Sequence, residues 1–554
     1  MNKKNRYFIT FALILAFITR TNSQDLTLKI FSKNKIENSF LSKIKIESNY
    51  KNSKSINDEL KKVQKRIQIN GYFLSSLDSI KINETKYSAY FTLNQKIDSV
   101  VLKHIDLTEI LLQKLKLKKN NFKVSINNLE KTLNKISKAK ENSGNSFSKI
   151  KLKNFKVIGK VLFTEIDIED SDKRKINKLI FNGYNNFPNN FIKNYFNINN
   201  TTIFNRQKLN TISKLSQNLN FASEKKPPEI LFTKDSTFAY IYLKKRKGNS
   251  FDGLVNFSSK ENGKIKFNGY LDLKLINTLN KGESLNLVWN SFGQERQEFS
   301  IATKTPYIFN TKVSPELKFS IYKQDSTFLN TNFNLKLKYQ IKNNSNLFLS
   351  YYSESSEKIA TVNFNNIETF ESSFIGFGYQ NKIKKGDAFK NDKFYLDINP
   401  SIGKRNSNNN SFKQIKIEST ISYILDLNKR NSLFLRNKTG LLNSENYIEN
   451  ELYRIGGNNS IRGFSEQSIF VKNYVLQNIE YRYLTTKNSF LYSITDLALI
   501  STANKKEKLL SIGLGYLFNT NNSQINISVT NGFSNNTEIN INNTQLFINW
   551  INFF

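Results

Sequence analysis

The hydrophobic and polar positions of this chain follow two different periods, and the change comes near residue 250. Before that point, apolar residues recur at helical spacing in several stretches, for example at Ile56, Leu60 and Val63. After it, apolar and polar residues alternate one by one, as they do along a β-strand whose two faces meet different surroundings. The sequence therefore predicts an α+β N-terminal part and an all-β C-terminal part.

The N-terminal part repeats a short pattern of strands and helices about every 70 residues. In the clearest repeat, a strand over residues 176–187 precedes helical stretches over 189–198 and 205–221. Strands over 229–235 and 238–245 follow. We expect three small α+β modules, at residues 24–103 (the least distinct), 104–172 and 173–248. Such modules expose sheet edges that can accept an extended peptide as an added strand, or they serve only as spacers.

The C-terminal part contains roughly sixteen alternating segments, each long enough to cross a membrane as a tilted strand. Many of them carry Phe or Tyr near an end, as the aromatic girdles of membrane barrels do. A soluble sandwich also alternates, but its strands average about 5–6 residues. The chain ends on the aromatic strand "QLFINWINFF", and a barrel removes both sheet edges by pairing its last strand with its first. We predict a transmembrane antiparallel β-barrel of about 16 strands over residues 250–554.

Residues 1–23 have the pattern of a secretory signal peptide. "MNKKNRY" is a basic start, "FITFALILAFI" is an apolar stretch too short to span a bilayer comfortably, and Ser23 is a small residue suited to cleavage. Nothing after residue 24 resembles a membrane helix. The chain has no cysteine, so disulfides, thiolate metal sites and a lipid-anchored N-terminus are excluded. We therefore expect an exported chain that is not anchored by a helix.

The formal net charge is +38, from 83 Lys and Arg against 45 Asp and Glu. Such a balance is typical of nucleic-acid or anionic-lipid binding. Here, however, the lysines are scattered between apolar residues, and Asn, Lys, Ile and Phe are enriched together, as a general compositional bias would produce. An exported chain rarely meets nucleic acid, so we expect no nucleic-acid partner. The single histidine, His104, argues against a histidine-based metal or proton-transfer site, and we expect an ordinary strand residue there.

The stretch "RIGGNNSIRGF", residues 454–464, places three of the chain's 21 glycines and two arginines within eleven residues. By the strand count it lies in the long sixth outward connection, between the eleventh and twelfth strands, where a loop is long enough to fold into the barrel. An arginine buried there needs a carboxylate partner. The next two strands supply Glu480, with Arg482 beside it, and then Asp496.

Together these features resemble the bacterial surface antigen family of outer-membrane barrels. That family comprises the barrel assembly factor, the barrel of the translocation and assembly module, and the two-partner secretion transporters. Its members join periplasmic POTRA (polypeptide-transport-associated) modules to a 16-stranded barrel whose sixth loop carries a GG…(V/I)RGF motif tucked inside. The matching positions here are Gly456, Gly457, Ile461, Arg462, Gly463 and Phe464.

The resemblance implies that Arg462 pairs with an acidic residue of the barrel wall, Asp496 or Glu480. It also implies a C-terminal strand signal, for which Trp550, Phe553 and Phe554 are the candidates. Two departures are visible: Asn552 interrupts the apolar alternation back from Phe554, and Leu497-Ala498 stand where many members have a nearby glycine.

The function implied is capture of unfolded clients on POTRA edges, followed by insertion or translocation at the seam between the first and last barrel strands. The alternative within the family is a two-partner secretion transporter for one exoprotein, and a passive porin is a third possibility. The expected partners are unfolded outer-membrane or secreted proteins and outer-membrane lipid, with periplasmic chaperones, accessory lipoproteins and an inner-membrane protein as further candidates. We expect no cofactor, no metal and no enzymatic activity, because no phosphate-binding loop or catalytic triad stands out.

Overall fold

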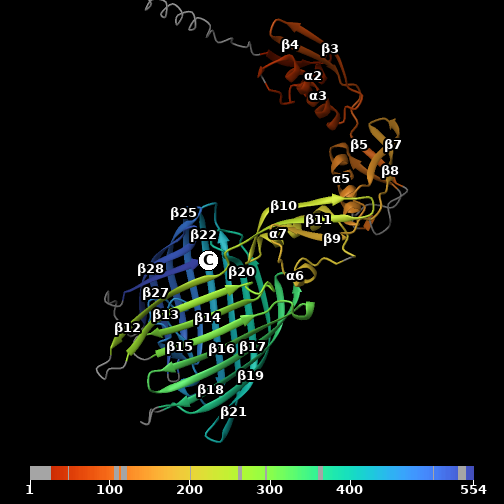
Figure 1. The fold of residues 1–554 in the computed structure, drawn as a ribbon. Helices are drawn as coiled ribbons and strands as arrows, with labels where there is room; N and C mark the ends of the chain where they lie inside the picture. Colours follow the sequence, from red (N-terminus) through yellow and green to blue (C-terminus); the bar gives the residue numbers. More distant parts are fainter. Residues whose placement is uncertain are drawn as a thin grey trace, which may run out of the picture. The chain divides into compact units, whose positions relative to one another are not determined.

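The computed structural model describes residues 26–47, 49–104, 112–113, 121–199, 201–259, 265–292, 296–359, 366–502, 505–534 and 544–554. The predicted signal peptide, residues 1–23, lies outside them. The described residues form three small α+β modules and one closed barrel (Figure 1). Among the described helices, none has both the length and the apolar character needed to cross a membrane.

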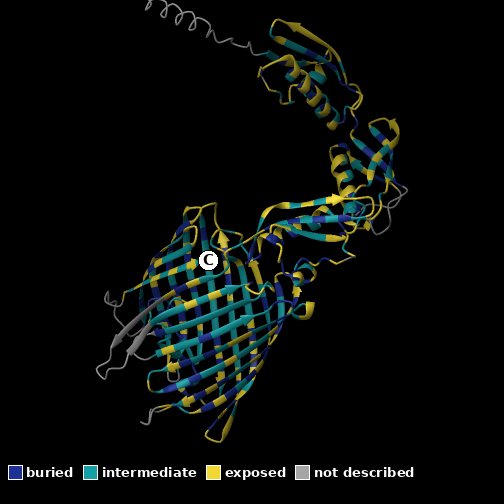
Figure 2. Cartoon of the chain, viewed as in Figure 1, coloured by how far each residue is buried: buried dark blue, intermediate teal, exposed yellow. Residues whose placement is uncertain are grey.

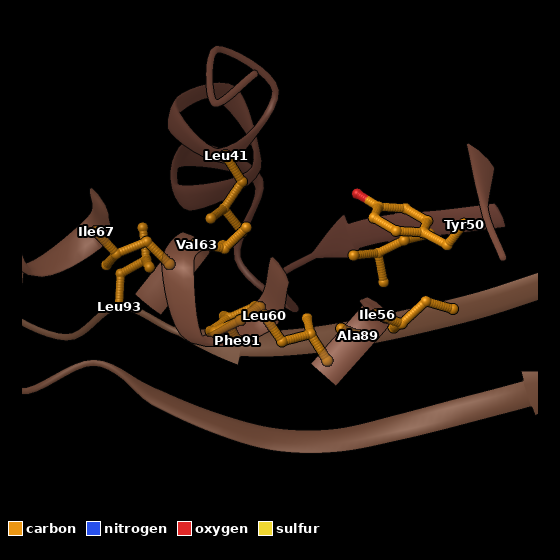
Figure 3. Packing of buried hydrophobic residues seen from close by; sticks show 10 residues of the cluster. Leu41, Tyr50, Ile56, Leu60, Val63, Ile67, Ala89, Phe91 and Leu93 are labelled. Atoms are coloured by element: carbon orange, nitrogen blue, oxygen red, sulfur yellow. The ribbon is translucent and has the colours of Figure 1, made fainter. Parts of the chain in front are cut away.

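The first module is a four-stranded sheet with two helices packed on it. The sheet order is β2-β1-β4-β3, and the elements are β1 (Leu26–Phe31), α2 (Lys35–Leu41), β2 (Asn49–Tyr50), α3 (Ser53–Ile69), β3 (Ser76–Asn83) and β4 (Lys86–Thr92). The apolar stripe of α3, including Ile56, Val63 and Ile67, packs against residues of β4 such as Phe91 (Figure 3). Burial of this stripe fixes the helix on the sheet, as the helical spacing in the sequence predicts.

The second module has the sheet order β6-β5-β8-β7 and one long helix. Its elements are β5 (Ser99–His104), β6 (Asn121–Ser125), α5 (Ile126–Asn142), β7 (Lys149–Ile158) and β8 (Val161–Glu169). Because β5 pairs in parallel with β8, the boundary predicted between residues 103 and 104 is wrong: it falls inside a strand of this sheet. His104 is the last residue of β5, buried beside Phe122.

The third module has the element order predicted for it, with β9 (Lys178–Asn182), α6 (Asn189–Asn194), α7 (Arg206–Gln217), β10 (Ala222–Phe232) and β11 (Thr237–Lys245). It packs against turns at the near end of the barrel. The ring of Phe191 meets that of Tyr307 edge-on at 5.1 Å, and Asn190 Nδ2 donates to the carbonyl of Pro306 at 3.0 Å. The third module and the barrel therefore share an apolar and hydrogen-bonded junction.

Sixteen antiparallel strands close the barrel, which confirms the predicted strand number. They are β12 (Ser250–Ser259), β13 (Ile265–Ile276), β14 (Ser284–Phe292), β15 (Arg296–Lys304), β16 (Val313–Gln324), β17 (Phe328–Lys342), β18 (Ser345–Lys358), β19 (Phe370–Lys384), β20 (Asp392–Ser407), β21 (Asn410–Asp426), β22 (Asn431–Ser444), β25 (Asn473–Thr486), β26 (Ser489–Ser501), β27 (Lys506–Asn519), β28 (Ser523–Ser534) and β29 (Gln545–Phe553). Since the number is even, the last strand ends at the same rim where the first begins.

The two faces of the barrel wall differ in polarity, and burial alternates along the strands (Figure 2). On β19, Ile375 and Phe377 are exposed on the outer face, whereas Ser372 and Gln380 are buried on the inner face. An apolar outer face and a polar interior are what a barrel in lipid requires. This pattern confirms the predicted transmembrane barrel, and barrels of this type lie in the outer membrane.

Candidate functional site

The connection between β22 and β25, residues 445–472, folds into the barrel interior and forms the candidate site. It contains a short 3₁₀ turn (Glu449–Glu451) and a small hairpin of β23 (Tyr453–Ile455) and β24 (Ile469–Val471). Gln467 donates to Glu298 of β15 at 2.6 Å, while Arg462 reaches β26 on another part of the wall. We call residues 445–472 the lumen loop, because it lies between these strands inside the barrel.

Apolar packing seats one side of the lumen loop. Ile461 is fully buried in a cluster that includes Ile455 and Val471 of the loop hairpin and Leu476 of β25. Phe464 packs against the same cluster. Removing these side chains from water fixes the tip of the loop against the wall, beside its charged residues.

The predicted glycines occupy positions where a side chain would not fit. Gly456, Gly457 and Gly463 all have positive φ, at 115°, 88° and 80°. A Cβ on Gly457 would lie 1.6 Å from a carboxylate oxygen of Glu466, which accepts a hydrogen bond from the Asn458 N–H. The glycines therefore permit both the backbone turn and the close approach that brings Arg462 to the wall.

Arg462 is buried between the two carboxylates that the sequence offered as partners. Its Nε and Nη2 donate to the two oxygens of Asp496 at 2.8 and 2.6 Å, and its own backbone N–H donates to Asp496 at 3.0 Å. Its Nη1 donates to Glu480 at 2.6 Å. The other Glu480 oxygen accepts two hydrogen bonds from Arg482. Both carboxylates are thus satisfied, as a buried ion-pair network requires.

A second polar cluster holds the start of the lumen loop. The Arg405 side chain, on β20, is fully buried and forms an ion pair with Glu451. Asn450 donates to Ser356 of β18 at 2.7 Å, and its carbonyl accepts from Asn330 of β17 at 2.7 Å. Nothing in the sequence motif pointed to these residues. Their only signal was polar side chains at inward positions of alternating strands.

Sequence reasoning also missed Gly532, which lies on β28 directly against Gly463 of the lumen loop. A Cβ on Gly532 would be 2.6 Å from the Gly463 carbonyl oxygen and 2.7 Å from the Phe464 ring. A glycine inside a strand pattern signals such a close backbone approach, and "TNGF" carried that signal.

The seam between the first and last strands is the weakest join in the barrel wall. Among the described residues, β12 and β29 are in register over two pairs, Ser250 with Phe553 and Phe251 with Asn552. By contrast, β12 pairs with β13 over ten residues and β28 with β29 over eight. Above the two pairs, the side chain of Asn549 donates to Asp252 across the seam. The wall is closed here by few hydrogen bonds.

The three predicted C-terminal residues lie on both faces of β29. Trp550 and Phe554 are exposed on the outer face, in one row with Asn552, which interrupts the apolar alternation of that row. Phe553 belongs to the other row, and Lys390 of the β19–β20 turn lies 3.9 Å from its ring centroid. Phe553 is therefore held at the rim, while Trp550 and Phe554 face outward.

Comparison with solved structures finds a similar fold in two structures of CdiB. CdiB from Acinetobacter baumannii has 14% sequence identity and a TM-score of 0.51, with 90% of this chain and 98% of that chain covered. CdiB from Escherichia coli has 12% identity, a TM-score of 0.51 and the same coverage. BamA from Haemophilus ducreyi lacking POTRA domains 1–3 has 13% identity and a TM-score of 0.47, over 83% of this chain and 99% of that chain. No protein-family model matches the chain, and no curated protein matches it.

The class defined by this fold is an outer-membrane β-barrel that carries α+β modules before its first strand. Within that class, the chain has a fold similar to that of the two CdiB structures. At 12–14% identity, this likeness concerns the fold.

Proposed function

We propose that this protein inserts or translocates unfolded protein clients across the outer membrane, using the seam between β12 and β29. The observation that carries the proposal is the two-pair register of that seam. Opening it disrupts few main-chain hydrogen bonds, and each opened strand then presents an edge to which a client strand can add. The client gains stability by burying its apolar face in lipid and completing its ladder, so no nucleotide is needed.

Two module edges are suited to receive the client first. β3 and β7 are the outer strands of their sheets, and they expose apolar side chains such as Ile82 and Phe155. The β10 edge of the third module differs, because Pro227-Pro228 removes two donors and the ladder is irregular on both sides of Lys226. We therefore propose that the first two modules capture the client, which adds to their sheets as an extra strand.

The lumen loop has a structural role in this mechanism. Arg462 ties the loop to β25 and β26, and Gly463 brings it against β28, the neighbour of the last strand. The loop thereby holds the wall next to the seam in shape while the seam itself opens. This role requires no chemistry from Arg462 beyond its ion pairs.

The test is a reversible disulfide that locks the seam. Because the chain has no native cysteine, the introduced pair is the only disulfide that can form within it. Phe251→Cys with Asn552→Cys joins β12 to β29, and Phe251→Cys with Leu273→Cys is the matched control, joining β12 to β13. Directly opposed residues in antiparallel strands have Cα atoms about 4.5–5.5 Å apart, within the range that a disulfide spans. The full chain is reconstituted in vesicles and supplied with a urea-unfolded barrel client.

We expect the oxidised seam lock to stop client insertion, reduction to restore it, and the β12–β13 lock to leave it unchanged. Full insertion by the locked protein would refute the seam mechanism.

The runner-up is a two-partner secretion transporter, which passes one exoprotein through the lumen. That function would survive the lock, and depletion of the protein would then remove a single secreted protein and leave other barrels at normal levels.

A further inference from the structure

The outer wall of the barrel has an apolar hollow on β18 to β22, away from the seam. Its volume is about 1240 Å³, and its floor is formed by aliphatic and aromatic side chains such as Leu349, Ile375, Ile402 and Ile415. Ile375 and Ile402 are 65% and 68% exposed on the face that meets lipid. Among the described lining residues, Glu445 is the first residue of the lumen loop, and none lies on β12 or β29.

A break in the ladder between β19 and β20 lies in the floor of the hollow. The register runs to Gly376 with Ser401 and resumes at Tyr379 with Ile398, leaving out Asn399 and Pro400. Proline has no N–H to donate, and in the middle of a sheet it is normally avoided. Pro400 stays in register with Ile417 of β21, so the wall departs from regular pairing at this proline on the β19 side alone.

Two lysines stand directly opposite each other at the outer end of the hollow. Lys404 on β20 pairs in register with Lys413 on β21, and both side chains are exposed on the outer face. In the described barrel ladder, no other two basic residues face each other in this way. Like charges directly opposite are destabilising unless an anion lies between them. Glu445 is the one carboxylate among the described lining residues.

We propose that this hollow binds a phosphorylated, multi-acyl glycolipid of the outer leaflet, of the lipid A type. Lys404 and Lys413 hold a phosphate of its headgroup, and the acyl chains lie on the apolar floor. The lysines are at the rim opposite the third module, which is the external rim when that module is periplasmic. Basic residues near a membrane surface attract anionic headgroups, and apolar residues below them match the chains.

The width of the hollow favours a lipid with several chains over a two-chain phospholipid. Its lining comes from five neighbouring strands, β18 to β22. With neighbouring strands about 4.8 Å apart, four gaps span about 19 Å. Hydrocarbon chains pack at a similar spacing, so the floor accommodates several chains side by side.

The experiment is native mass spectrometry of the full-length protein in detergent, titrated with lipid A, phosphatidylglycerol or phosphatidylcholine. Lys404→Gln with Lys413→Gln removes the charges, and Ile402→Phe with Ile415→Phe fills the floor without changing charge. The matched control is Lys323→Gln with Lys508→Gln, two outward-facing lysines of β16 and β27 outside the hollow. The heat-dependent mobility of the barrel on gels verifies that every variant is folded.

We expect the wild type and the control to bind lipid A alike. The Lys404/Lys413 variant should bind lipid A about thirty-fold more weakly, because it loses two lysines that each contribute about 1 kcal/mol to the attraction of an anionic headgroup. The floor-filled variant should also lose affinity. If phosphatidylglycerol bound as tightly as lipid A, the assignment to a lipid with several acyl chains would be wrong. If the control variant lost as much affinity for lipid A as the Lys404/Lys413 variant, the effect would be general charge attraction, and the proposed site would be wrong. If the Lys404/Lys413 variant binds lipid A like the wild type, the proposal is wrong.

Discussion

The ion pair of Arg462 with Asp496 allows a quantitative test of how the lumen loop is held. Arg462→Ala removes three guanidinium hydrogen bonds to buried carboxylates. At about 1.5 kcal/mol each, the low end for bonds to charged groups, they amount to about 4.5 kcal/mol. This lies within the roughly 3–5 kcal/mol that breaking a buried ion pair costs, because Asp496 is left fully buried without its charge partner.

The assay is hydrogen exchange of the peptide covering residues 454–464, in which the Gly457 N–H bonds to the Phe464 carbonyl. A loss of 3–5 kcal/mol raises the open population of the loop by roughly 150-fold to 5,000-fold. Arg482→Ala is the control, because it leaves every Arg462 contact in place. Arg462→Ala with Asp496→Ala should exchange more slowly than Arg462→Ala alone, since the double variant leaves no unpaired carboxylate at position 496, while Glu480 keeps its ion pair with Arg482. If Arg462→Ala exchanged like the control, the ion pair would not be what holds the loop.

Two further predictions concern close packing and pH. Gly532→Val should release the lumen loop, because its side chain would overlap the Gly463 carbonyl, whereas the isosteric Thr530→Val on the same inward row should not; protease sensitivity of the loop measures both. In the second module, burial raises the pKa of Asp170, but hydrogen bonds from Lys140 and Ser148 outweigh it and hold that pKa below its ordinary value. A carboxyl group whose pKa is depressed in the folded state stabilises the fold at pH values above its unfolded-state pKa of about 3.9. This stabilisation is lost as pH falls through the folded-state pKa. Hydrogen exchange of α5, corrected for intrinsic rates, should therefore accelerate in that acid range in the wild type and less in Asp170→Asn.

The alternation of apolar and polar residues predicted the barrel and its strand number, since one lipid face and one inner face leave little freedom of register. The modules were harder to delimit. β5 is short and joins a strand some 60 residues later, and local pattern says nothing about such pairing. The boundary near residue 103 was wrong for this reason.

For the candidate site, the motif indicated which arginine is buried, and strand positions narrowed its partners to Glu480 and Asp496. Only the structure shows that Arg462 binds both carboxylates at once. Gly532 and the Arg405–Glu451 pair depend on which strands the loop crosses, which no spacing in the sequence encodes. Pro400 was visible in the sequence, but its effect appears only once β19 lies beside it.

The sparse seam also has a consequence for how the barrel itself forms. All its other strand pairs join consecutive barrel strands, so they can assemble hairpin by hairpin along the chain. The seam alone joins segments about 300 residues apart, from Ser250 to Phe553, and closing so long a loop is entropically costly for few hydrogen bonds in return. Closure is therefore expected to be the last and most reversible step of folding. An open, curved sheet would be the barrel's own precursor, and the state that receives a client would be a return to that precursor.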